Sequence, residues 1–343
     1  MNKKILHIIG RSSYDGTCIF AYRLSISLPQ YDFFYLFKHK GRAEEEIQRS
    51  NKNIFNLDTS DNKNKIAIWI KAIVFFARNR FDIIHYHSGG VVLLLISVFF
   101  RKGAKVIYHI HCGNMNCDPM KKKLSFIERV LYHFINSKIF KISVADHVTE
   151  FYKKNVGVSD KLITIKNSVP FEFQKKNIVS RKIGYIGQIS SYKGFDEIVN
   201  LAQLSEPKFE ILVKGDNYYK ASYFENKNIH FFDPSLRICE FFDTIDMFLF
   251  PSRSQYEGTP LVILEAIAHD VAVICCKTKA TQEILGDYPL FVDSFSTDVL
   301  VNTINHFYSA EFNRGKLSEI HREIHNKYSF FKMKKEIIKL YEK

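Results

Sequence analysis

Short apolar runs alternate with longer amphipathic segments along the whole chain, and this alternation predicts its elements. In the first half, runs of strand length are separated by stretches whose apolar residues recur at helical spacing. The expected strands are Ile5–Ile9, Phe33–Phe37, Ile54–Leu57, Ile83–His87, Val106–His111, His147–Val148 and Leu162–Ile165, and the expected helices are Phe20–Ser27, Lys65–Arg78, Val91–Phe99 and Lys123–Phe134. Strands that alternate with helices are typical of parallel sheets covered by helices, so we expect an α/β fold.

A polar stretch from Glu172 to Ser180 separates this series from a second one of the same kind. The expected strands of the second half are Lys182–Ile186, Glu210–Val213, Ile229–Phe232, Met247–Phe250, Val271–Cys275 and Leu290–Phe291. A chain of 343 residues is long enough for two domains, each with its own core. We therefore expect two doubly wound domains, over residues 1–172 and 181–328. Residues 329–343 are expected to form an amphipathic helix across the domain junction.

The net charge of +13 favours an anionic partner, such as nucleotide phosphates, an anionic bilayer or nucleic acid. Nucleic acid is disfavoured, because no known binding module is present and aromatic residues do not interleave with a basic stripe. Lys121, Lys122 and Lys123 precede an apolar stripe at helical spacing. This pattern fits a helix on an anionic membrane surface, although such a stripe more often belongs to a core helix with lysines at its edge.

Two features bear on where the protein acts. The chain runs from Met1 directly into the first expected strand, without a signal peptide. Its longest other apolar stretch, Val91 to Phe100, has about half of the roughly 20 residues that a membrane-spanning helix needs. We expect a cytoplasmic protein, and peripheral attachment to the inner face of the cell membrane stays open. The six cysteines lack metal-ligand spacing, so we expect reduced thiols and no metal site.

The stretch from Glu257 to Glu265 joins two carboxylates, a glycine turn and a helix start. Thr259 is expected to cap the helix and Pro260 to occupy its first position. Gly258 would let a ligand approach the backbone, while the two carboxylates accept hydrogen bonds from hydroxyl groups. Hydroxyls together with a phosphate at a helix N-terminus suggest a nucleotide sugar. The alternative is a pair of ordinary surface acids.

Two blocks of sequence carry a resemblance to a known family. The first contains Phe250-Pro251-Ser252, Glu257-Gly258-Thr259-Pro260-Leu261 and Leu264-Glu265-Ala266, and the second contains Ile183 to Gln188 and Lys193-Gly194-Phe195. Together they resemble the retaining glycosyltransferases of the GT-B architecture, called glycosyltransferase family 4 or glycosyl transferases group 1. The resemblance implies two Rossmann-like domains that face a central cleft. The acceptor would bind the first domain and a nucleotide diphosphate sugar the second, and neither a metal nor another cofactor would be required.

The resemblance also implies roles for residues of the second domain. Glu257 would lie near the reacting sugar, Glu265 would hold the ribose hydroxyls and Lys193 would stabilise the leaving diphosphate. The family usually has arginine where this chain has Gln188, and Arg253 is our candidate for a substitute cation. The donor site would be completed by Gly187, Gly258, Thr259 and Pro260.

In the first domain, Val106 to His111 resembles the family's strand whose terminal histidine faces the donor sugar. His111 is therefore a candidate catalytic residue, with His109 as the fallback and a structural role as the alternative. His85 and His87 are interpreted as packing at the sheet end. The loop from Gly10 to Thr17 lacks the family's adjacent glycine pair, and Gly16 is the residue we expect to contact substrate there.

The expected function is the transfer of a sugar, with retention, to a glycan or lipid-linked acceptor in surface polysaccharide biosynthesis. Two alternatives stay open. The departure at Gln188 fits a non-catalytic subunit that binds nucleotide sugars, and the fold also serves nucleotide-sugar epimerases, which need no separate acceptor.

Overall fold

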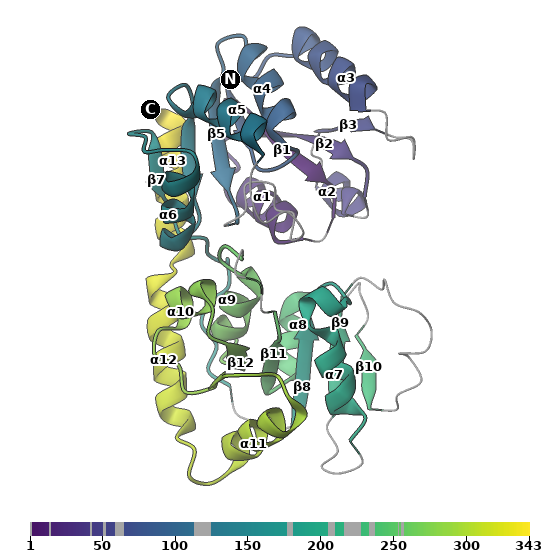
Figure 1. Cartoon of the computed structure of the whole chain (residues 1–343), viewed down its shortest axis with the longest axis vertical. Coiled ribbons are helices and arrows are strands. Elements are labelled where there is room, and N and C mark those ends of the chain that lie inside the picture. Colours follow the sequence, from purple (N-terminus) through teal and green to yellow (C-terminus); the bar gives the residue numbers. More distant parts are fainter. Residues whose placement is uncertain are drawn as a thin grey trace. The chain divides into compact units, whose positions relative to one another are not determined.

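The computed structural model describes residues 2–13, 15–41, 43–50, 53–58, 65–112, 125–176, 181–204, 210–215, 228–232, 237–252, 254 and 257–343. They form two compact units, each built on one parallel sheet (Figure 1). The first unit contains the chain up to Lys166, a short segment with Glu257, Gly258 and Thr259, and the chain from Met333 onward. The second unit contains the chain from Asn167, without that short segment, up to Lys332.

The sheet of the first unit has the strand order β3-β2-β1-β4-β5-β6-β7. Its strands are β1 (Lys4–Arg11), β2 (Asp32–His39), β3 (Asn53–Asp58), β4 (Ile83–Tyr86), β5 (Lys105–Ile110), β6 (Phe140–Ser143) and β7 (Leu162–Thr164). Its helices are α1 (Gly16–Ser27), α2 (Glu44–Arg49), α3 (Lys65–Arg78), α4 (Val91–Phe99), α5 (Phe126–Asn136) and α6 (Asp146–Asn155). The order reverses at β1, which makes the sheet doubly wound.

Alternation along the strands gives the first sheet two different faces. One face carries Leu6, Ile8 and Ile84, which belong to a core shared with helices α3 to α6. The other face carries histidines, His7 and His85 among them, which are fully buried.

Helix α13 (Phe330–Glu342) covers the second face of this sheet with its last turns. The Tyr341 hydroxyl lies 2.6 Å from Nδ1 of His85. Lys105 Nζ donates to the Leu340 carbonyl at 2.7 Å, and the Tyr31 hydroxyl donates to Glu342 Oε1 at 2.6 Å. The end of the chain therefore completes the first unit.

The sheet of the second unit has the order β10-β9-β8-β11-β12-β13. Its strands are β8 (Lys182–Ile186), β9 (Glu210–Lys214), β10 (Ile229–Phe231), β11 (Met247–Phe250), β12 (Ala272–Cys276) and β13 (Phe291–Val292). They are covered by η1 (Ser191–Lys193), α7 (Phe195–Ala202), α8 (Ile238–Thr244), α9 (Leu261–Ala268), α10 (Lys279–Leu285), α11 (Thr297–Tyr308) and α12 (Arg314–Lys327). The two parallel sheets with flanking helices confirm the predicted α/β class.

One predicted strand is wrong. His147 and Val148 lie in helix α6, whereas the strand is β6, over Phe140–Ser143. The pattern misled because β6 contains Lys141, a charged residue that is fully buried. Its ammonium group donates to the Ile139 carbonyl at 3.1 Å and to Ser159 Oγ at 2.9 Å, so the strand tolerates a cation in its core.

Helix α1 begins at Gly16, before the predicted start at Phe20, because the Asp15 carboxylate caps it by accepting from the Cys18 amide at 2.9 Å. The cysteines in the described part of the chain are free thiols, as expected. Among the described residues, no helix combines the length and apolarity that crossing a bilayer requires.

Candidate functional site

The carboxyl edge of the second sheet brings Gly187 and Lys193 to neighbouring strand ends. Gly194, which follows Lys193, has φ +75°, and a Cβ there would lie 2.7 Å from Cβ of Pro251. The left-handed backbone and the lack of space both require glycine at this position. Because Gly194 packs against Pro251, the residue after β11, Lys193 is held beside the end of that strand. Ligands of doubly wound sheets bind at this edge.

Gly187 and Gln188 directly follow strand β8. Gly187 has φ +155°, and a Cβ there would lie 3.2 Å from the Tyr185 hydroxyl. That hydroxyl donates to the Gln188 carbonyl at 2.8 Å, which fixes the turn, while Gln188 itself is exposed. The turn therefore presents a polar, uncharged side chain to solvent. Arg253, the candidate substitute cation, lies outside the described residues.

Glu265 lies on helix α9 and is only 3% exposed. The helix is apolar around it, with Ile263, Leu264 and Ala266 buried. His269 Nδ1 donates to the Glu265 carbonyl at 2.8 Å at the end of this helix. Its burial rules out the alternative of an ordinary surface acid for Glu265.

The expected cap of α9 is wrong. The N-cap position is Pro260, with no side-chain hydrogen bond, and the helix begins at Leu261. Thr259 instead donates its hydroxyl to the Val144 carbonyl, at 2.8 Å, in the loop after β6. A backbone carbonyl of the first unit therefore accepts the hydrogen bond of the Thr259 side chain, which we had assigned to the start of the helix.

Glu257 and Gly258 lie beside the ends of β5 and β6, within the first unit. Glu257 forms an isolated antiparallel bridge with Cys112, and His147 Nε2 donates to the Glu257 carbonyl at 2.9 Å. A Cβ on Gly258 would collide with the carbonyl oxygen of His111. The space left by the missing side chain of Gly258 is thus occupied by the backbone of His111. It sets Glu257 next to His111, the two residues predicted to act at the reacting sugar.

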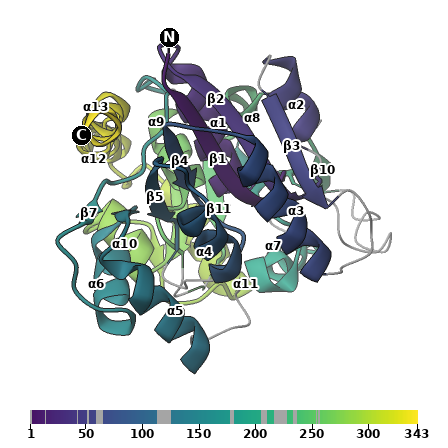
Figure 2. The same cartoon turned by 90° about the horizontal axis from the view of Figure 1, so that it is seen from above.

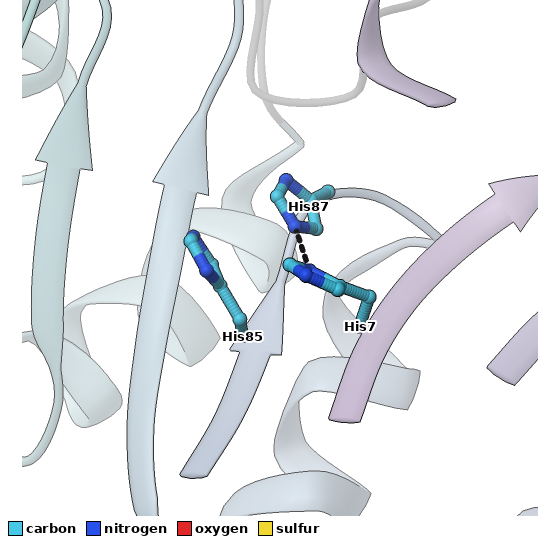
Figure 3. Close-up of side chains that lie close together, drawn as sticks. All are labelled: His7, His85 and His87. Atoms are coloured by element: carbon cyan, nitrogen blue, oxygen red, sulfur yellow. Dashed lines mark hydrogen bonds between the residues drawn. The ribbon is translucent and has the colours of Figure 1, made fainter. Parts of the chain in front are cut away.

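His111 is the partly exposed end of a ladder of histidines on β1, β4 and β5 and in the loops after them. Nε2 of His111 lies 2.9 Å from Nδ1 of His87. On the other side of its ring, Nε2 of His87 lies 2.7 Å from Nδ1 of His7 (Figure 3). Beside this row, His85 Nε2 lies 3.1 Å from His109 Nδ1. Each contact joins one donor nitrogen to one acceptor nitrogen, so the tautomers along the ladder are coupled.

Burial keeps the ladder uncharged. It lowers the pKa of His85, His87 and His109 well below the ordinary histidine value, and it lowers the pKa of His111 to about 3. Neighbouring histidines add to the effect on the three buried rings, because two adjacent imidazolium charges repel. His111 therefore offers a neutral imidazole at neutral pH, which both donates and accepts hydrogen bonds.

The ladder also contains two sets of rings near enough to hold a metal ion. One nitrogen from each of His7, His85 and His87 lies within 4.8 Å of the others, and the same holds for His87, His109 and His111. However, the His109 and His111 rings are stacked, with centroids 4.3 Å apart and planes 25° apart. Lone pairs of nearly parallel rings run side by side and do not converge on one ion. We interpret the ladder as a hydrogen-bonded array.

From the sequence we interpreted His85 and His87 as packing at the sheet end, and we did not identify His7. The signal that could have found the ladder is the spacing of two between His85 and His87 and between His109 and His111. Such spacing places side chains on one sheet face. Gly16, expected to contact substrate, is exposed as the first residue of α1.

Comparison with known proteins agrees with this fold. Residues 169–324 match the family described as Glycosyl transferases group 1. The crystal structure of Anabaena HepE in complex with UDP and glucose superposes with a TM-score of 0.78, covering 99% of each chain at 13% identity. The predicted resemblance is confirmed in these respects: the fold is that of GT-B glycosyltransferases, and the second half matches their family.

Two relatives are similar in sequence. A Klebsiella pneumoniae protein, described as an uncharacterized 41.2 kDa protein in the cps region, is 24% identical over 71% of this chain and 73% of its own length. A Bacillus subtilis protein, described as the putative teichuronic acid biosynthesis glycosyltransferase TuaC, is 23% identical over 66% of this chain and 61% of its own length.

Proposed function

We propose that this protein transfers a sugar from a nucleotide diphosphate sugar to an acceptor. The premise is that residues 169–324 are of the glycosyl transferases group 1 type. The acceptor is a glycan or a lipid-linked sugar, and transfer retains the anomeric configuration. The observation that carries the proposal is the bridge between Glu257 and Cys112, which sets Glu257 beside His111. A carboxylate and a neutral imidazole on neighbouring backbone segments suit a site that orients hydroxyl groups around a sugar.

The second unit supplies groups suited to the donor nucleotide. Lys193 carries a positive charge at the strand edge, where it would stabilise the diphosphate as the glycosidic bond breaks. The backbone amides at the start of α9 would add to this stabilisation. Glu265 would accept hydrogen bonds from two adjacent ribose hydroxyls. Gln188 contributes a hydrogen bond without charge, so Lys193 does more of the electrostatic work than in a site with two cations.

The first unit supplies groups suited to the reacting sugar. Glu257 would orient sugar hydroxyls and stabilise positive charge that develops on the ring. His111, neutral at physiological pH, would act as a hydrogen-bonding group and not as a cationic acid. The proposed transfer requires no metal ion, because Lys193 and backbone amides serve the leaving diphosphate.

A role in surface polysaccharide biosynthesis is supported by the two relatives. One is described from a cps region and the other as a putative enzyme of teichuronic acid biosynthesis. We extend this class of product to the present protein as part of the proposal.

The test is turnover of labelled nucleotide diphosphate sugars by the purified full chain, with and without oligosaccharide acceptors and with EDTA. We expect transfer that EDTA leaves unchanged and a product of retained configuration by NMR. Glu257→Gln should lower kcat by about 100-fold or more, as loss of a group acting in the transition state does. Glu336→Gln, a change on the exposed surface of α13, is the matched control.

Other outcomes would redirect the proposal. Equal turnover by Glu257→Gln and wild type would remove Glu257 from the site. Donor binding without turnover, under every acceptor tried, would favour the non-catalytic subunit that the exposed Gln188 suggests. An epimerised donor that forms without any acceptor would favour an epimerase.

A further inference from the structure

Helices α3, α4 and α5 carry large apolar side chains on their outward side. On α5, Phe126 is 80% exposed and Ile127 69%, and Val130 and Phe134 continue the same stripe. The neighbouring helices add exposed residues, which are Phe99 and Phe100 at the end of α4 and Ile66, Ile70 and Val74 on α3. We call these nine residues the apolar face. Isolated exposed apolar residues are common on proteins, whereas a gathered set marks a surface that binds something.

The structure decides between the two interpretations that the sequence left open for α5. Tyr132 and Ile135 bury the inner side of this helix in the core of the first unit. A capping box between Ser125 and Glu128 fixes the start of the helix. The core is therefore satisfied by one side of α5, and the outward stripe is a second apolar side without a role in that core.

The apolar face extends over three helices that pack against one another in sequence order. The rings of Phe99 and Phe134 stack with centroids 6.1 Å apart, which joins α4 to α5. Figures 1 and 2 show α3, α4 and α5 following one another along the same side of the sheet. Residues spaced by four, such as Ile66, Ile70 and Val74, give α3 an outward stripe of the same kind.

Cations surround the apolar face. Lys138 Nζ lies 3.7 Å from the centre of the Phe134 ring. Exposed basic residues on or next to the same helices are Lys71, Arg78, Arg101, Lys102 and Arg129. In the sequences of the three helices, Glu128 is the only carboxylate, and it is engaged in the capping box of α5.

We propose that the apolar face docks on an anionic lipid bilayer. Its aromatic and aliphatic side chains would enter the boundary between headgroups and acyl chains, and its lysines and arginines would contact anionic headgroups. Charge favours this occupant over a second copy of the chain, because pairing two such faces would oppose like charges. The proposal does not depend on sugar transfer, although docking would concentrate the protein at a lipid-linked acceptor.

The experiment is co-sedimentation of the full chain with vesicles of phosphatidylcholine alone or mixed with phosphatidylglycerol, at low and high salt. We expect binding only to the mixed vesicles, weakened by salt. Serine replacements at Ile127, Val130 and Phe134 together should weaken binding about tenfold or more, since each removes an inserted side chain. The control replaces the equally exposed Ile26, Val158 and Phe331 by serine and should bind like wild type.

Charge is tested separately. Arg129→Glu with Lys138→Glu should weaken binding, whereas Lys153→Glu with Lys154→Glu, on the exposed surface of α6, should have a smaller effect. Equal binding by the two triple-serine variants, or no binding by wild type, would overturn the proposal. So would a dimer in light scattering that the apolar-face variant abolishes. Unchanged turnover of a soluble acceptor by the variant with serine at Ile127, Val130 and Phe134 would separate failure of docking from failure of the proposed function.

Discussion

At the scale of single residues, some backbone conformations can be predicted from sequence although their partners cannot. Asp270 follows helix α9 where a helix-ending glycine is common, and aspartate is one of the few other residues that adopt the left-handed conformation which this position demands. Its φ is +53°. Its carboxylate accepts from Ser318 Oγ and His321 Nδ1, each at 2.8 Å. These partners lie far along the chain, so no local pattern indicates them.

Gly194 offers the sharpest test at this scale. Gly194→Ala would place a Cβ 2.7 Å from Pro251 and hold alanine in left-handed backbone. We expect a loss of about 2 kcal/mol or more in the free energy of unfolding, together with weaker donor binding. Urea unfolding followed by circular dichroism measures the first effect.

The matched control for Gly194 is Gly286→Ala, also in the second unit. Gly286 has φ +63°, but a Cβ there would meet no atom within 4 Å. Its backbone, with φ +63° and ψ −130°, also disfavours alanine, so this variant should show backbone strain alone, about 1–3 kcal/mol, and unchanged donor binding. Donor binding that weakens no more in Gly194→Ala than in Gly286→Ala would mean that contact with Pro251 does not constrain the loop after Lys193.

At the scale of elements, uninterrupted apolar strands were predictable, and the exception has a physical reason. Strand β6 was missed because Lys141 interrupts its apolar run. Burial lowers the pKa of Lys141 to about 8, and its partners lie in the turn before the strand and in the loop before β7. Only the folded chain brings those carbonyl and hydroxyl oxygens to the ammonium group. From the sequence, the strand was therefore placed wrongly at His147 and Val148, near the start of α6.

The histidine ladder, which joins β1, β4 and β5, predicts sensitivity to acid. Its folded-state pKa values lie below the unfolded value of 6.5. Between these values the unfolded chain binds more protons, so stability is full above pH 6.5 and falls as the pH drops. His85, His87, His109 and His111 should each contribute up to about 1.4 kcal/mol per pH unit in that window.

Trp69, the single tryptophan of the chain, lies on α3 and reports unfolding of the first unit by fluorescence. We expect its urea midpoint to fall steeply from pH 7 to pH 5. His85→Gln should reduce that slope, whereas His133→Gln, at an exposed position on α5, should not. A slope that is the same in all three proteins would show that the ladder does not remain neutral in the folded state.

At the scale of the whole molecule, the sequence predicted two sheets and a closing helix but not the position of the central motif. Glu257, Gly258 and Thr259 precede α9 directly, so sequence reasoning assigned them to the second domain. In the structure they belong to the first unit, through Cys112, His111 and Val144. Contacts between residues so distant along the chain arise only from tertiary packing.

The packing of helix α13 against the first unit can be tested by shortening the chain. Removing residues 340–343 deletes the buried Leu340 and Tyr341 and exposes His85. The free energy of unfolding of the first unit should fall by about 3 kcal/mol or more, as for other large buried side chains. Fluorescence of Trp69 measures this. Removal of Lys343 alone is the control, and an unchanged midpoint after the longer deletion would contradict the packing of α13.

The same helix has a consequence for how the protein is made. A ribosome synthesises residues 333–343 only after it has synthesised the whole second unit, yet Tyr341 and Glu342 bind His85 and Tyr31 in the first unit. The first unit therefore cannot complete its fold while translation of the second proceeds. During that interval the histidine face of the first sheet is not covered by α13. The newly synthesised chain therefore depends on chaperones, or on rapid completion of synthesis and folding, to avoid aggregation.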